Sequence, residues 1–105
     1  MIKHIVLWNI RSAEGVDRRT EVYRQFSQKT EHLQRVIPEI KEARVALNTN
    51  EGQDAFDICI DSVFDNPEAL EAYINHPEHL KVRAYMDSVT CGKTVFDYFY
   101  KSEEC

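Results

Sequence analysis

The chain has 105 residues and a mass of 12.3 kDa, which suits one domain and leaves no length for a second. Its 13 basic and 18 acidic side chains give a net charge of −5, so electrostatics do not draw it to nucleic acid or to anionic lipid. Hydrophobic residues make up 43% and charged residues 30%, which excludes a disordered or a membrane-spanning chain. We therefore expect a single domain over residues 1–105 that binds neither nucleic acid nor membrane.

The three cysteines, Cys59, Cys91 and Cys105, lie too far apart in the sequence for a CxxC pair or a zinc-ligand spacing. This usage is typical of free thiols in a reducing compartment, and we expect Cys105 to be exposed. The apolar N-terminus is short, is interrupted by Lys3 and His4, and lacks a small-residue cleavage site, so it does not resemble a signal peptide. The sequence predicts a cytoplasmic protein.

The first half of the chain predicts a strand, a long helix and a second strand. Residues 2–9 are apolar on both parities, which favours a strand buried on both faces. A helix is expected over 18–36, with Asp17 as its N-cap and Pro38 as its stop. Residues 39–48 alternate imperfectly and predict a strand. The apolar stripe of the helix consists of Val22, Phe26, Leu33 and Val36, with Ile37 beside the last.

The second half predicts a strand over 55–64, a broken helix and a last strand over 94–100. Asn66 and Pro67 are a strong helix start, and Leu70, Tyr73 and Ile74 give this helix its contact face. The helix breaks at His76-Pro77 and restarts, with Leu80 and Ala84 on one side, Tyr85 adjacent and Gly92 ending the region. The order β-α-β-β-α-β predicts an α+β, ferredoxin-like fold with an antiparallel four-stranded sheet.

The helices of such a fold cover only one face of the sheet. The last strand is apolar on both sides, since Phe96, Tyr98 and Tyr100 share one parity while Val95 and Phe99 share the other. An uncovered apolar face of this size marks an interface. We expect a homodimer in which two sheets pack face to face into an α/β barrel. The alternative is a monomer whose loops or C-terminal tail cover the sheet, although that tail is short.

The break at His76-Pro77 matters for chemistry because a chain reversal there can turn Tyr73 and His79 toward a common pocket. His79 would lie in the first turn of a helix, where the dipole favours a neutral imidazole that accepts a proton at pH 7. The phenol of Tyr73 can donate a hydrogen bond to a developing enolate oxygen. The pair predicts proton abstraction next to a carbonyl, with His79 and Tyr73 as catalytic residues.

His4, Trp8 and His76 are the predicted ligand-binding residues. His4 and Trp8 share one parity of the first strand, and His76 lies beside the break. No carboxylate or thiol completes a recognisable metal-ligand spacing with His4, His76 and His79, so we expect no metal and no cofactor.

Four segments resemble the stress-responsive α/β-barrel (Dabb) family, and together they span essentially the whole chain. They are residues 2–7, 36–40, 69–79 and 96–98, of which the tyrosine followed by His-Pro-x-His at 73–79 is the most specific. The resemblance implies a ferredoxin-like fold that dimerises into an α/β barrel. It extends distantly to olivetolic acid cyclase, which implies catalytic roles for Tyr73 and His79 and places that enzyme's first-strand histidine at His4.

Three functions fit these residues. The first is a homodimer that binds a small carbonyl-containing molecule between helices and sheet, with cyclase-like or lyase-like chemistry at His79 and Tyr73. The second is a non-catalytic stress-response or assembly protein in which Tyr73 packs in the core and His79 bonds to backbone. The third, by analogy of fold alone, is a cofactor-free monooxygenase. A cavity that contains both the Tyr73 hydroxyl and the His79 imidazole would favour the first.

Overall fold

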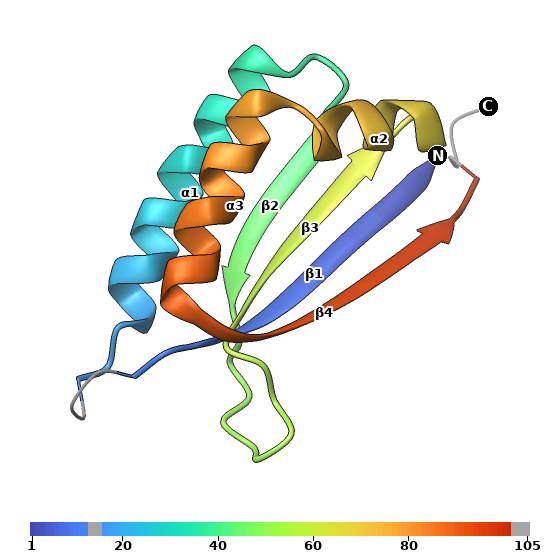
Figure 1. The fold of residues 1–105 in the computed structure, drawn as a ribbon. Helices are drawn as coiled ribbons and strands as arrows, with labels where there is room; N and C mark the ends of the chain where they lie inside the picture. The colour runs from blue at the N-terminus through green and yellow to red at the C-terminus, as the bar shows by residue number, and fades with distance from the viewer. Residues whose placement is uncertain (13–15, 102–105) are drawn as a thin grey trace.

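A computed structural model describes residues 1–12 and 16–101 and shows three helices packed on one face of a four-stranded sheet (Figure 1). The elements are β1 (Ile2–Ile10), α1 (Arg19–Val36), β2 (Glu42–Leu47), β3 (Ile58–Phe64), α2 (Pro67–Ile74), α3 (Pro77–Val89) and β4 (Thr90–Phe99). All neighbouring strands are antiparallel, in the order β2-β3-β1-β4. The ferredoxin-like α+β fold is confirmed, and so is the helix break. The expected exposure of Cys105 lies outside the described residues.

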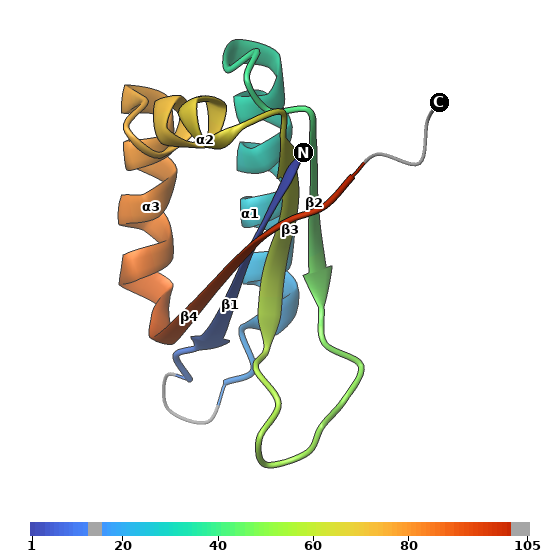
Figure 2. The ribbon, with the colours of Figure 1, turned by 90° about the vertical axis from the view of Figure 1, so that its right-hand side faces the viewer.

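The two faces of β1 have different surroundings. Ile2, His4, Val6 and Trp8 are buried beneath the helices, whereas the alternate residues, including Ile5 and Leu7, are only partly buried. The prediction that β1 is buried on both faces is therefore wrong within a single chain. No element of the described residues covers the face that carries Ile5 and Leu7. Figure 2 shows this side of the sheet free of helices.

The long helix α1 follows the expected apolar stripe except at its C-terminal end, and its N-cap also differs from the prediction. Val22, Phe26 and Leu33 are buried, but Val36 is 38% exposed, and Ile37 takes its place in the core. Ile37 lies four residues after Leu33 and so points in nearly the same direction. The expected N-cap, Asp17, is wrong, because Asp17 precedes the cap position by one residue. The cap position is Arg18, and the Asp17 carboxylate accepts from the backbone N–H of Arg19 at 3.0 Å.

The start of α2 is confirmed in detail. Asn66 Oδ1 accepts from the Ala69 N–H at 2.8 Å, and Pro67 occupies the first turn, where its missing N–H is not needed. The contact face of α2 is also close to the prediction, because Leu70 and Tyr73 are buried and Ile74 packs partly buried against the core.

The end of α3 differs from the prediction. The buried face is Val82, Met86 and Val89, and Leu80 is 47% exposed. The helix ends at Val89 rather than near Gly92, and β4 begins at Thr90 with no loop between them. Pairing with β1 overrides the local signal, since Gly92 lies opposite Asn9 beside a register shift between Asn9 and Ile10. A Cβ on Gly92 would meet Asn9 Nδ2 at 3.4 Å, which is an ordinary van der Waals contact.

The uncovered side of the sheet, which we call the open face, carries apolar side chains on β1 and β4 and charged side chains on β1, β2 and β3. Ile5 pairs with Phe96 and Lys3 with Tyr98, so these side chains share the open face. Phe96 is 62% exposed and Tyr98 is 40% exposed, and their rings lie 5.9 Å apart. The charged positions of this face are Lys3, Glu42, Arg44 and Asp61.

Candidate functional site

A cavity of about 180 Å³ lies between the helices and the β1–β4 side of the sheet. All three helices contribute to its lining, as do β1, β3 and β4. The polar side chains His4, Tyr73 and His79 share this cavity with a largely apolar wall. That wall consists of Val6, Trp8, Phe26, Ile60, Ile74, Val82, Met86 and Val95.

Tyr73 and His79 lie side by side although they belong to different helices. Their ring centroids are 4.2 Å apart with planes tilted by 45°. The break between α2 and α3 makes this contact, because Pro77 begins α3 and the His76 N–H donates to the Tyr73 carbonyl at 3.1 Å, which tightens the end of α2. The common pocket expected from the sequence is present in the structure.

The protonation of His79 is set by its surroundings. Its Nδ1 donates to the backbone carbonyl of Ile74 at 3.0 Å, because a carbonyl oxygen can only accept. In the neutral ring Nε2 is then the nitrogen with the free lone pair. Burial lowers the pKa of His79; the hydrogen bond to Ile74 acts in the opposite direction, and the nearby basic side chains His4, Arg83 and Lys93 lower the pKa further. The result is a neutral imidazole able to accept a proton at neutral pH.

Tyr73 is held as a neutral phenol. Its side chain is 4% exposed, packed against Phe64 with ring centroids 5.0 Å apart, and burial raises the pKa of Tyr73 to about 12. Within the described part of the chain, the Tyr73 hydroxyl has no hydrogen-bond partner. A hydroxyl without a partner on the wall of a cavity is available to an oxygen atom of a ligand.

His4 is fixed from the opposite wall. Its Nδ1 and the Asp97 carboxylate oxygen lie 2.5 Å apart, and a carboxylate accepts, so Nδ1 carries the proton. The pair is bound across adjacent strands, since His4 lies opposite Asp97 in the β1–β4 register. The His4 ring stands edge-on to Tyr73, with centroids 6.2 Å apart. Two histidines with assigned tautomers therefore flank the same phenol.

The remaining two predicted ligand residues have different positions. Trp8 lines the cavity and stacks edge-on against Phe26, with ring centroids 5.2 Å apart. His76 does not line it. Instead its Nδ1 accepts from the Glu78 N–H at 3.1 Å and caps α3. The structure thus brings His4, Trp8, Tyr73 and His79 together and leaves His76 at the helix start.

The prediction from sequence missed the charged rim of the cavity, which consists of Arg83, Asp87, Lys93 and Asp97. Two spacings could have revealed it. Arg83 lies four residues after His79 on one helix, and Lys93 and Asp97 alternate with Val95 on the strand. Within residues 1–12 and 16–101, no group of three His, Cys, Asp or Glu side chains lies close enough to hold a metal ion.

A scan against protein-family models matches residues 2–100 to the Stress responsive A/B Barrel Domain, abbreviated Dabb. This chain belongs to the Dabb family. The match covers every strand and helix described above. Among the curated proteins no match was found.

Solved structures share the fold of this Dabb chain over nearly its full length. A dimeric protein of unknown function from Bacteroides fragilis is 30% identical, with a TM-score of 0.83, and the alignment covers 94% of this chain and 95% of that one. A Dabb family protein from Mesorhizobium loti is 17% identical, with a TM-score of 0.73 and coverages of 96% and 97%. A hydroxynitrile lyase from Passiflora edulis is 18% identical, with a TM-score of 0.77 and coverages of 95% and 93%.

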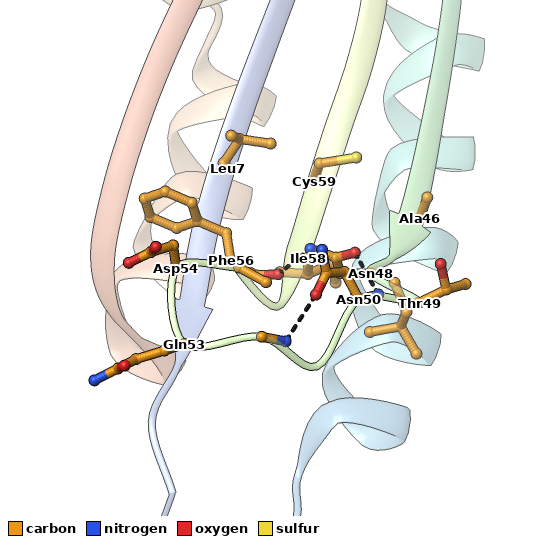
Figure 3. Close-up of a pocket in the computed structure, with 13 residues that line it drawn as sticks. Leu7, Ala46, Asn48, Thr49, Asn50, Gln53, Asp54, Phe56, Ile58 and Cys59 are labelled. Atoms are coloured by element: carbon orange, nitrogen blue, oxygen red, sulfur yellow. Dashed lines mark hydrogen bonds between the residues drawn. The ribbon is translucent and has the colours of Figure 1, made fainter.

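A second hollow, of about 680 Å³, lies where the loop between β2 and β3 meets the open face of this Dabb chain (Figure 3). The loop is held by its own amides: Asn48 Oδ1 accepts from the Asn50 N–H at 2.8 Å, and Asn50 Oδ1 accepts from the Gly52 N–H at 2.7 Å. No histidine, tyrosine, lysine or arginine is among its lining residues. Although the hollow is larger than the cavity, it lacks a paired acid and base, so the cavity around Tyr73 is the better site.

No helix within the described residues is long and apolar enough to cross a membrane.

Proposed function

We propose that this Dabb protein binds a small carbonyl-containing molecule in the cavity and acts on it by acid–base chemistry, with His79 as the base and Tyr73 as the hydrogen-bond donor. The observation that carries the proposal is the contact between these two rings on the wall of one cavity, with ring centroids 4.2 Å apart. The cavity of about 180 Å³ is smaller than the pockets that hold drug-sized ligands, so it suits only a small molecule.

The proposed step is the removal of a proton from the carbon next to the carbonyl. His79 Nε2 accepts the proton, and the electron pair of the broken C–H bond moves into the carbonyl group to form an enolate. The Tyr73 hydroxyl donates a hydrogen bond to the enolate oxygen, where negative charge develops. A phenol whose pKa lies at about 12 stays protonated and can only stabilise that charge through a hydrogen bond. The enolate can then add to a second carbonyl, as in a cyclase, or take a proton back.

His4 supports this step as a second polar contact. Its Nδ1–H is held by Asp97, so its other ring nitrogen is the one left for a ligand or for water. The Passiflora edulis protein of the same fold is a hydroxynitrile lyase. That precedent keeps lyase-like chemistry in the proposal.

We propose further that the functional unit is a homodimer formed through the open face, with two sheets closing into a barrel. Phe96 and Tyr98 expose large rings on this face beside Ile5 and Leu7. Burying about 1,000 Å² of such apolar surface would contribute on the order of 25 kcal/mol before the entropy of association is subtracted. The related protein from Bacteroides fragilis is dimeric, which supports the same assembly here.

Exchange of α-protons in deuterated water tests the proposed chemistry directly. We expect the protein to accelerate exchange at the carbons beside the carbonyl of 2-hexanone, followed by proton NMR, relative to buffer. The variants His79→Gln and Tyr73→Phe should lose that acceleration while the far-UV circular dichroism stays unchanged. Binding of the ketone without exchange would contradict the catalytic part of the proposal and favour a non-catalytic binding or assembly protein.

A further inference from the structure

Two cations border the cavity from opposite walls. Arg83 extends from α3 and Lys93 from β4, and both side chains line the cavity. Neither forms a salt bridge with a carboxylate of the described residues, although Lys3, Arg18, Arg19, Lys41 and Lys81 all do. The unpaired basic side chains of this rim are therefore available to a ligand.

The acidic members of the rim do not neutralise these cations by direct contact. Asp97 is bound to His4 Nδ1 on the β1 side. Asp87 lies one turn after Arg83 on α3, and no salt bridge joins the two. The charges that act on His79 through space are His4, Arg83 and Lys93, and all three are basic. Arg83 and Lys93 therefore lie near enough to the proposed base to act on it, in a chain whose net charge is −5.

We propose that the molecule bound in this cavity is a short oxo acid, whose carboxylate binds Arg83 and Lys93 while its carbonyl oxygen lies at Tyr73. This inference rests on the proposed function, because it assigns the substrate class of the same site. The apolar wall of Trp8, Phe26 and Met86 contacts the hydrocarbon part of the ligand. Two cations on opposite walls fix a carboxylate in one orientation, which directs the carbon next to the carbonyl toward His79.

The chain carries its own reporter for a binding test, since Trp8 is its only tryptophan and lines the cavity. Three probes of similar length separate the two ligand groups: 2-oxohexanoate has a carboxylate and a ketone, 2-hexanone has only the ketone, and hexanoate has only the carboxylate. Each is titrated against the full chain by Trp8 fluorescence at low and at high salt. We expect 2-oxohexanoate to bind about tenfold more tightly than 2-hexanone at low salt, and we expect added salt to weaken this preference.

The variant that removes both cations is Arg83→Gln with Lys93→Gln, and both positions are exposed, so the fold should survive. We expect it to bind 2-oxohexanoate no better than 2-hexanone while its affinity for 2-hexanone stays unchanged. The matched control is Arg24→Gln, which removes a positive charge from the exposed side of α1 outside the cavity. It should keep the wild-type preference.

The possible results distinguish the inference from the function on which it rests. Equal affinity of the wild-type chain for 2-oxohexanoate and 2-hexanone would overturn the assignment of a carboxylate and leave the carbonyl site intact. Hexanoate binding as tightly as 2-oxohexanoate, with no binding of 2-hexanone, would support the roles of Arg83 and Lys93 and overturn the carbonyl function. Absence of binding by all three probes would overturn both proposals.

Discussion

His79 donates its Nδ1–H to the backbone carbonyl of Ile74 across the break between α2 and α3, at 3.0 Å. The acceptor is the last residue of α2, and the donor lies in the first turn of α3. The carbonyl of Ile74 would be left without a partner at a helix end, and the imidazole satisfies it. The same bond assigns the tautomer in which Nε2 accepts a proton. The helix break therefore both turns His79 toward Tyr73 and selects its chemical form.

Acid should destabilise the protein through His79. Burial lowers the pKa of this histidine in the folded chain, so below a pH of about 6.5 the unfolded chain takes up the proton first. The stabilisation is complete above that pH and is lost as the pH falls through the folded pKa. We expect His79→Gln to flatten the fall in the free energy of unfolding between about pH 7 and pH 5. Urea unfolding at one fixed protein concentration measures the free energy of unfolding at each pH, with the exposed His32→Gln as a control. If the free energy of unfolding fell equally with pH in the wild type and in His79→Gln, that result would contradict the expectation.

Removing the Tyr73 hydroxyl should separate chemistry from folding. The ring packs against Phe64, and Tyr73→Phe keeps that contact, while the hydroxyl has no partner among the described residues. The free energy of unfolding should therefore change by less than about 1 kcal/mol. The catalysed α-proton exchange of 2-hexanone should fall by about 100-fold, as when one oxyanion donor is removed. Exchange at the wild-type rate in Tyr73→Phe would show that the hydroxyl plays no part.

His76 should act on stability and not on the ligand. Its Nδ1 accepts from the Glu78 N–H, so His76→Ala removes the cap of α3 and should lower the free energy of unfolding by about 1 kcal/mol. His76→Asn supplies another capping side chain and should recover most of that loss. Binding of 2-hexanone, followed by Trp8 fluorescence, should be the same in both variants and the wild type. A loss of binding in His76→Asn with stability retained would instead place His76 in contact with the ligand.

Charge on the open face should separate the proposed dimer. Phe96 is 62% exposed on that face, and Phe96→Lys would bury an unpaired ammonium group between two sheets. In sedimentation at micromolar concentration, the wild type should have twice the 12.3 kDa mass of one chain. The variant should have the mass of one chain. Leu80→Lys is the control, because Leu80 is 47% exposed on α3, away from the sheet. A wild-type chain that sediments at 12.3 kDa would contradict the dimer.

The local sequence predicted most of the fold, because its signals agree with the tertiary contacts. Asn66 with Pro67 and the Pro77 break act through neighbouring backbone, and the structure keeps them where the sequence placed them. The failure at Gly92 occurs because a distant strand decides the outcome. Gly92 ends a helix by local rules, but its pairing with Asn9 draws residues 90–93 into β4.

The site was predictable to a similar degree. The Tyr73 and His79 pair follows from a local chain reversal, which the sequence shows as His-Pro. Cross-strand register is not written in local sequence, so the bond between His4 and Asp97, which are 93 positions apart, emerges only from the fold. Arg83 and Lys93 were overlooked for the same reason, since each resembles an ordinary solvated charge until the walls of the cavity are assembled.

The direct passage from α3 into β4 has a mechanical consequence. Lys93 and Val95 of β4 face the cavity, and Thr94 and Phe96, which alternate with them, face the opposite way. No loop at Thr90 absorbs motion between helix and strand. A backbone shift that widens the cavity would also displace the aromatic rings on the far side, so we expect binding of the proposed ligand to alter the proposed self-association through this strand.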